Sequence, residues 1–146
     1  SISNQSIEKN STVYISRFNG MSMEENVFRE KLNATLKRKG YVTVNNFQKS
    51  EYYLFINFNN RFQKNLNQQR NLDIFQTELF LIESKNISYN LGLPFDRDDA
   101  VWLCKIELNW LEFLKYQDDL LETISKYFCK SYYGRRMFTN TFYFIL

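Results

Sequence analysis

The residues of this sequence that come nearest to a chemical site are cations beside aromatic rings. Positions 37–39 of the stretch LKRKGYVTVNNFQKSEYYLFINF are all lysine or arginine, and Tyr53 and Phe55 follow on the next segment. Cations neutralise phosphates and aromatic rings stack on bases, so this combination is typical of proteins that bind single-stranded nucleic acid. The same cations also complement the dipole at the C-terminal end of a helix. We favour the helix-end interpretation, because EYYLFINF lacks the glycine of an RNA-recognition strand and opens on an acid.

A binding face can still be read from the alternation of side chains in EYYLFINFNNRF. Alternate residues of this predicted strand point outward and would be available to a partner. The candidate binding surface comprises these outward residues and the preceding cations: Tyr53, Phe55, Asn57, Arg61, Lys37, Arg38 and Lys39. Arg135 and Arg136 are further basic residues near the C-terminus. The net charge of the chain is only +3, which is small for a strong nucleic-acid binder.

The sequence offers few of the residues on which enzyme active sites commonly depend. The chain contains no histidine, which excludes Ser-His-Asp and Cys-His pairs and histidine metal ligands. Cys104 falls on the apolar face of a predicted strand, where it would serve as a small core residue, and Cys129 falls off the apolar stripe of a predicted helix. A disulfide between them is an alternative, and a catalytic thiol is a weaker one because no base stands out to activate it. We therefore expect a protein that is not an enzyme and has no cofactor.

The acidic group in FDRDDA resembles a metal-binding loop only loosely. A calcium loop requires acids at alternate positions, a central glycine and a closing glutamate. Asp96 and Asp98 satisfy the alternation, Asp99 does not extend it, and the glycine and glutamate are missing. A solvated loop with Arg97 as a partial counter-charge is the better interpretation, so we predict no metal site.

The first helix is the element that the sequence marks best. Ser22 and Glu25 have the spacing of a capping box, and apolar residues recur at every fourth position of FREKLNATL. Acidic residues near the start, cations at positions 37–39 and Gly40 just beyond them agree with the helix dipole and a C-terminal cap. These features predict a helix over residues 22–39.

The other elements are predicted from alternation and turn signals. The predicted strands cover residues 13–18, 41–44, 51–62, 73–84, 101–113 and 135–146, with a helix as the alternative for 73–84. A second helix is predicted from residue 118, with Gly134 just past its end. The fold class is therefore α+β, a mostly antiparallel sheet with two helices packed on one face, in the order β-α-β-β-β-β-α-β. Residues 1–12 are interpreted as a flexible polar lead and residues 13–146 as a single domain.

The order of these motifs resembles that of small Gram-negative lipoproteins attached to the outer membrane, and more distantly that of LptE-like and TolB-N-like α/β modules. The stretches that carry the resemblance are FREKLNATLKRKGYVTV, SEYYLFINF, AVWLCKIELNW and DDLLETISKYFCKSYYG. The lipobox cysteine of such proteins is not in this chain, and YYGRRMF stands where they often have a proline. The resemblance implies a periplasm-facing domain, tethered by a lipid through its N-terminal lead, that scaffolds or assembles an envelope complex.

Two hypotheses of different kinds follow for the function. The leading one is a non-enzymatic module that docks protein partners of an envelope complex through strand edges and an aromatic surface. In this hypothesis the membrane is contacted only through an N-terminal lipid anchor. The alternative is a small nucleic-acid-binding or ribonucleoprotein subunit from an AT-rich or organellar genome, and an enzyme is the weakest option.

Overall fold

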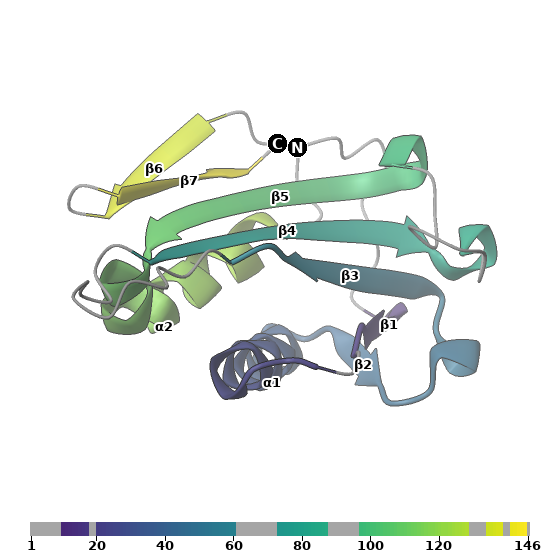
Figure 1. Cartoon of the computed structure of the whole chain (residues 1–146). Coiled ribbons are helices and arrows are strands. Elements are labelled where there is room, and N and C mark those ends of the chain that lie inside the picture. The colour runs from purple at the N-terminus through teal and green to yellow at the C-terminus, as the bar shows by residue number, and fades with distance from the viewer. Residues whose placement is uncertain are drawn as a thin grey trace.

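The computed structural model describes residues 10–17, 20–60, 73–87, 97–128, 134–138 and 141–145. Within them a seven-stranded sheet is formed by β1 (Thr12–Ile15), β2 (Val42–Val44), β3 (Tyr52–Phe58), β4 (Ile74–Glu83), β5 (Ala100–Asn109), β6 (Gly134–Phe138) and β7 (Thr141–Ile145). The helices α1 (Met23–Arg38) and α2 (Trp110–Tyr127) both lie on one face of this sheet (Figure 1). The α+β class predicted from the sequence is therefore confirmed.

The direction of the strands fixes the direction of the helices. The strand order is β2-β1-β3-β4-β5-β7-β6, in which β1 runs parallel to β2 and β3 and the other neighbours are antiparallel. α1 joins β1 to its parallel neighbour β2, so it runs opposite to both. β5 has the same direction as β1, and α2 turns back from the end of β5. The two helices therefore lie parallel to each other.

α1 forms where the sequence predicts it, with both ends fixed by local hydrogen bonds. The Glu25 backbone N–H donates to Ser22 Oγ at 3.1 Å, and the Ser22 N–H donates to Glu25 Oε1 at 2.9 Å, which completes the capping box. Gly40 follows the end of the helix with a φ of 99°, a conformation that favours glycine. The apolar stripe Phe28, Leu32 and Leu36 is fully buried.

The start of α2 corrects the sequence prediction. A strand over residues 101–113 and a helix beginning at Asp118 were expected, but β5 ends at Asn109 and the helix begins at Trp110. Asn109 Oδ1 accepts the backbone N–H of Leu111 at 2.9 Å and that of Glu112 at 3.4 Å, so this side chain caps the helix. The alternation of VWLCKIELNW hides the change, because a residue at the helix start continues the inward side of the strand.

The C-terminal segment also differs from the prediction. α2 ends at Tyr127, well before Gly134, which was expected just past its end and instead opens β6. The segment 135–146 was predicted as one strand but forms parts of two, β6 and β7, which pair antiparallel with each other. β7 also pairs with β5, so β6 is the last strand at this end of the sheet. In a hairpin the backbone N–H and C=O groups of each strand find hydrogen-bond partners on the other strand. One long strand at the edge of the sheet would leave one side of its backbone without such partners.

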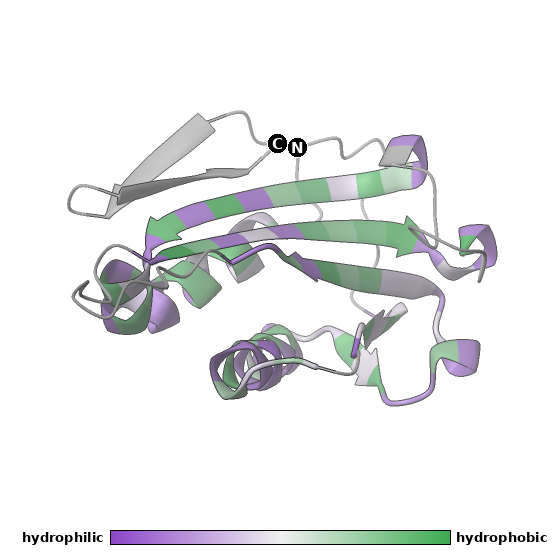
Figure 2. Cartoon of the chain, viewed as in Figure 1, coloured by the Kyte–Doolittle hydropathy of each residue, from purple (hydrophilic) through white to green (hydrophobic). Residues whose placement is uncertain are grey.

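The core lies between the helices and the inner face of the sheet. The rings of Phe75 on β4 and Phe113 on α2 stack at a centroid distance of 3.7 Å, and Phe28 on α1 lies 5.5 Å from the first and 5.8 Å from the second. All three side chains are fully buried. Hydrophobic residues follow the central strands in Figure 2, whereas α1 carries both hydrophobic and hydrophilic residues. The aromatic contacts hold both helices on the same region of the sheet.

One charged side chain is buried at the junction of β1 and α1. Arg29 is only 6% exposed, and its guanidinium donates to the backbone carbonyls of Ile15 at 2.6 Å and Ser16 at 2.8 Å. A third contact reaches Glu30 Oε1 at 2.8 Å. Because each contact uses a different nitrogen, the buried charge is well satisfied and ties α1 to the end of β1.

We expect Arg29→Met to lower the free energy of unfolding by about 3 kcal/mol, because two carbonyls lose a charged donor near the core. The matched control is Arg17→Met, since Arg17 contacts the same Glu30 oxygen but is 64% exposed. That change should cost less than about 1 kcal/mol. Urea denaturation followed by circular dichroism measures both values, and equal losses would show that Arg29 is no more than a surface cation.

Candidate functional site

The outer face of the sheet, opposite the helices, carries a continuous series of aromatic side chains. We call it the aromatic row, and it consists of Phe47, Tyr14, Tyr53, Phe55 and Phe80. Ring centroids of neighbouring members are 5.3 Å apart for Phe47 and Tyr53, 5.5 Å for Tyr14 and Tyr53, 6.2 Å for Tyr53 and Phe55, and 6.4 Å for Phe55 and Phe80. These separations are typical of interacting aromatic pairs.

Strand register brings the row together. Tyr14 on β1 is the register partner of Tyr53 on β3, and Phe55 on β3 is the register partner of Phe80 on β4. Partners directly across a ladder point to the same face of the sheet, so the four rings share its outer side. Phe47 joins them from a short 3-10 helix, Phe47–Lys49, in which the Gln48 N–H donates to the Asn46 side chain at 3.0 Å.

The aromatic row is half-buried rather than bare. Tyr53 and Phe55, which the sequence predicted as outward residues, do lie on the outer face, but each is partly covered by its neighbours. Phe80 is 1% exposed and belongs to a small second core with Ile82, Ala100 and Leu103. An antiparallel sheet with one helix-covered face commonly carries polar residues on the other. Here the outer face is apolar and aromatic in its central part.

Polar groups mark one end of this face. Asn57 Nδ2 donates to Glu78 Oε1 at 3.4 Å, and Lys105 Nζ lies 4.0 Å from Glu78 Oε2. Asn57 and Glu78 are register partners on β3 and β4, and Glu78 is in turn the register partner of Lys105 on β5. The outer face therefore offers aromatic rings beside a line of amide, carboxylate and ammonium groups.

The predicted basic residues lie elsewhere. Lys37, Arg38 and Lys39 are exposed at the end of α1, which packs on the opposite side of the sheet from the aromatic row. Arg38 and Lys39 both form ion pairs with Glu122 of α2, the second at 3.1 Å. Arg61 lies outside the described residues. The structure thus does not combine these cations with Tyr53 and Phe55 into one nucleic-acid platform.

The structure also places some of the cysteine and acidic residues that the sequence analysis considered. Cys104 lies inside the core, as its strand position predicts, and burial raises the pKa of its thiol to about 12. Cys129 and Asp96 lie outside the described residues. Within the described part of the chain no group of acids or thiols is arranged to hold a metal ion. No helix in the same residues is long and apolar enough to cross a membrane.

The sequence analysis missed three members of the row, Tyr14, Phe47 and Phe80, and it did not identify the exposed apolar residues on the helices. Tyr14 could have been found, because it alternates with the buried residues Val13 and Ile15. Phe47 follows Asn46 in a short helix, which nothing in the periodicity indicates. Leu111 was assigned to the end of a strand and Leu114 to no element, so their exposure on a helix was not predicted from the sequence.

Comparison with known proteins supports the fold alone. The sequence matches no family model, and no curated protein matches it. Among solved structures, the PelC dodecamer from Paraburkholderia phytofirmans gives a TM-score of 0.53 at 11% identity, over 88% of this chain and 96% of that one. This protein therefore shares its fold with PelC.

Two further similar structures are lipoproteins. Uncharacterized lipoprotein B from Nitrosomonas europaea gives a TM-score of 0.40 at 12% identity, over 83% of this chain and 81% of that one. A minor lipoprotein from Acinetobacter baumannii gives 0.37 at 12% identity, over 82% of this chain and 92% of that one. At these TM-scores the two similarities are too slight to support a conclusion about this chain.

The buried thiol leads to a pH-dependent prediction. A thiol in the unfolded chain ionises at its ordinary pKa, whereas Cys104 in the folded chain stays protonated up to about pH 12. The folded state then binds more protons between these two pKa values, so stability falls as the pH rises through that window. Relative to Cys104→Val, the wild-type chain should lose on the order of 1 kcal/mol more between pH 7.5 and pH 10. Urea denaturation in reductant at both pH values measures this, and parallel losses would contradict it.

Proposed function

We propose that this chain is a non-enzymatic protein-binding domain that acts on the periplasmic side of the outer membrane as a scaffold or assembly factor of an envelope complex. The observation that carries the proposal is the aromatic row on the outer face of the sheet. Tyrosine and phenylalanine are enriched at the centre of protein interfaces, because they offer a large contact area that loses little conformational entropy on binding. The row presents such rings together on a rigid sheet.

The surroundings of the row favour a protein partner over a nucleic acid. Asn57, Glu78 and Lys105 supply an amide, a carboxylate and a cation beside the rings, which suits a polar rim around an apolar centre. A phosphate backbone would meet the Glu78 carboxylate there. The basic group at positions 37–39 lies on the other side of the sheet and cannot neutralise a strand bound to the row.

The location of the domain is proposed from the family resemblance of the sequence. Lipid attachment through the polar N-terminal lead would hold the domain at the membrane and leave the sheet free to dock partners. The fold that the chain shares with PelC, a protein that forms a dodecamer, is compatible with a role in assembly. The absence of histidine removes the catalytic pairs that depend on an imidazole, and the non-enzymatic part of the proposal rests on this feature of the sequence.

A site-specific photo-cross-linker at Asn57 tests the docking surface. In envelope fractions of the native organism's cells, we expect the Asn57 position to give one dominant protein adduct, which mass spectrometry identifies. The matched control is Asn33 on α1, which has the same side chain and a similar half-buried environment but lies on the helix side of the sheet. Adducts of equal yield from both positions, or none from Asn57, would contradict docking at the aromatic row.

Lipid attachment is tested separately with the natural gene, including the codons upstream of Ser1. Cells labelled with radioactive palmitate should incorporate the label into this protein, and the labelled form should fractionate with the outer membrane. Replacing the lipidated cysteine should release the protein into the periplasm. A precursor without a signal peptide and a lipidated cysteine would remove the lipoprotein part of the proposal and leave the docking surface to be judged on its own.

A further inference from the structure

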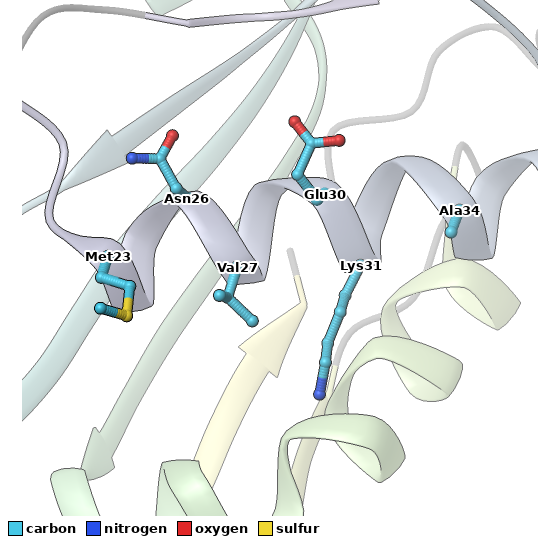
Figure 3. Close-up of a pocket in the computed structure, with 6 residues that line it drawn as sticks. All are labelled: Met23, Asn26, Val27, Glu30, Lys31 and Ala34. Atoms are coloured by element: carbon cyan, nitrogen blue, oxygen red, sulfur yellow. The ribbon is translucent and has the colours of Figure 1, made fainter.

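A hollow on the exposed side of α1 is one apolar surface outside the aromatic row. It has a volume of about 630 Å³, and the described residues that line it all belong to α1: Met23, Asn26, Val27, Glu30, Lys31 and Ala34. Figure 3 shows Met23, Val27 and Lys31 on one side of the helix and Asn26 and Glu30 on the other. The polar side chains among them already have partners within the chain, since Asn26 donates to the Ser22 carbonyl, Glu30 accepts from Arg29, and Lys31 pairs with Asp118. The lining of the hollow therefore points to no particular occupant.

The edge of the sheet at β2 is a second such surface, and it does carry groups that select an occupant. In the strand order, β2 is the terminal strand on one side and β6 is the terminal strand on the other (Figure 1). β1 pairs with one side of the β2 backbone, and within the described residues no strand pairs with the other side. A strand edge of this kind offers N–H and C=O groups to an extended chain that lies along it.

The hydrogen bonds of β1 show which residues face β2. The Ser16 N–H donates to the Leu54 carbonyl of β3 at 2.9 Å, and the Thr12 carbonyl accepts the Glu51 N–H just before β3 at 3.1 Å. Both of these β1 positions therefore face β3. Because successive residues of a strand direct their backbone groups to opposite neighbours, Val13 faces β2.

Thr43 is the residue of β2 whose backbone groups face the free side. Its register partner on β1 is Val13. In a parallel ladder, a residue bonds to the two residues that flank its register partner, so Val13 bonds to Val42 and Val44. The N–H and C=O of Thr43 then point away from β1, toward the position that a further strand would take.

The side chains of β2 continue the apolar outer face to this edge. Val42 and Val44 are the register partners of Thr12 and Tyr14, and Tyr14 belongs to the aromatic row. Val42 is 43% exposed and Val44 is half-buried. Edge strands are commonly protected by a charge, a proline or a bulge within the strand. Apart from its short length, β2 has none of these protective features.

Cations gather at the end of the sheet where β2 begins. Positions 37–39, just before the turn into β2, are exposed lysine or arginine. Lys49 lies at the same end, because its carbonyl accepts a hydrogen bond from Thr12 Oγ1 at 3.2 Å and Thr12 is the register partner of Val42. In the described part of the chain, one carboxylate, that of Glu122, pairs with two of the three cations at positions 37–39. This end of the edge therefore keeps an excess of positive charge.

We infer that the β2 edge binds an extended segment of a partner protein, which adds a strand beside β2 and carries acidic residues near these cations. Hydrogen bonds to the backbone of Thr43 hold the added strand, and its alternate side chains lie beside Val42 and Val44 on the outer face. The inference rests on the proposed function, because the added strand continues the surface of the aromatic row. A second copy of this chain is a poorer occupant, since it would bring the same cations to the edge.

A synthetic peptide tests the edge directly. The probe is a short peptide of alternating valine and threonine with glutamates at both ends, added to the isotope-labelled chain. We expect it to shift the amide resonances of Thr43 and its neighbours, with a dissociation constant of about 1 mM because few backbone hydrogen bonds are available. A peptide with the same centre and lysines at both ends should bind about fivefold more weakly. Equal binding of both peptides, shifts confined to β6, or no shifts at all would overturn the inference.

A proline variant separates backbone pairing from side-chain contact. Thr43→Pro removes the outward N–H and leaves the bonds between β1 and β2 in place, so it should weaken binding of the glutamate peptide at least about tenfold in a folded chain. The matched control, Thr43→Val, changes the same side chain but keeps the N–H and should bind as the wild type does. Val44→Pro removes an N–H that bonds to β1, so it should destabilise the fold instead. Equal binding by Thr43→Pro and Thr43→Val would contradict strand addition.

Cross-linking in the native envelope distinguishes this inference from the proposed function. A photo-cross-linker at Val42 should capture the same protein as the one at Asn57, through a segment that contains acidic residues. Thr43→Pro should lower the yield of the Asn57 adduct several-fold. An Asn57 adduct of undiminished yield in Thr43→Pro would leave docking at the aromatic row intact and overturn strand addition at β2. Failure of Asn57 to form an adduct in the wild-type chain would instead count against the proposed function, and the peptide would then decide the edge alone.

Discussion

The structure depends on the burial of aromatic rings between the helices and the sheet. Phe28, Phe75 and Phe113 come from α1, β4 and α2, and their mutual contacts exclude water from the centre of the inner face. Because each ring belongs to a different element, the cluster forms only when both helices lie on the same region of the sheet. It therefore fixes the position of each helix on the sheet.

The two faces of the sheet differ in how completely their aromatic rings are buried. On the inner side the rings are fully enclosed, and exposed side chains of the two helices form ion pairs with each other. On the outer side the alternation of β3 and β4 places further rings in register, of which Tyr53 and Phe55 are half-buried and Phe80 is buried. The aromatic row and the ion pairs between the helices therefore lie on opposite sides of the sheet.

Local chemistry explains why some elements could be predicted and others could not. α1 is specified by a capping box, an apolar stripe and a following glycine, all within one short segment. α2 lacks such a clear start, because the inward alternation of β5 continues through Trp110 and the Asn109 cap is a single residue. The inward side of β3 was predicted correctly, since the period of a strand assigns alternate residues to opposite faces. The solvent exposure of the outward residues of β3 could not be predicted, because the side chains that bury them come from other elements.

The sequence by itself determined the α+β class, the first helix, the core position of Cys104 and the absence of histidine chemistry. These properties depend on composition or on residues close together in the chain, where periodicity and capping act. Only the tertiary structure decided that Lys37, Arg38 and Lys39 lie away from Tyr53 and Phe55, and that Lys31 meets Asp118. The physical reason is that strand order and register set which distant segments become neighbours. Strand order and register are determined by the burial of the whole core, and no single segment specifies them.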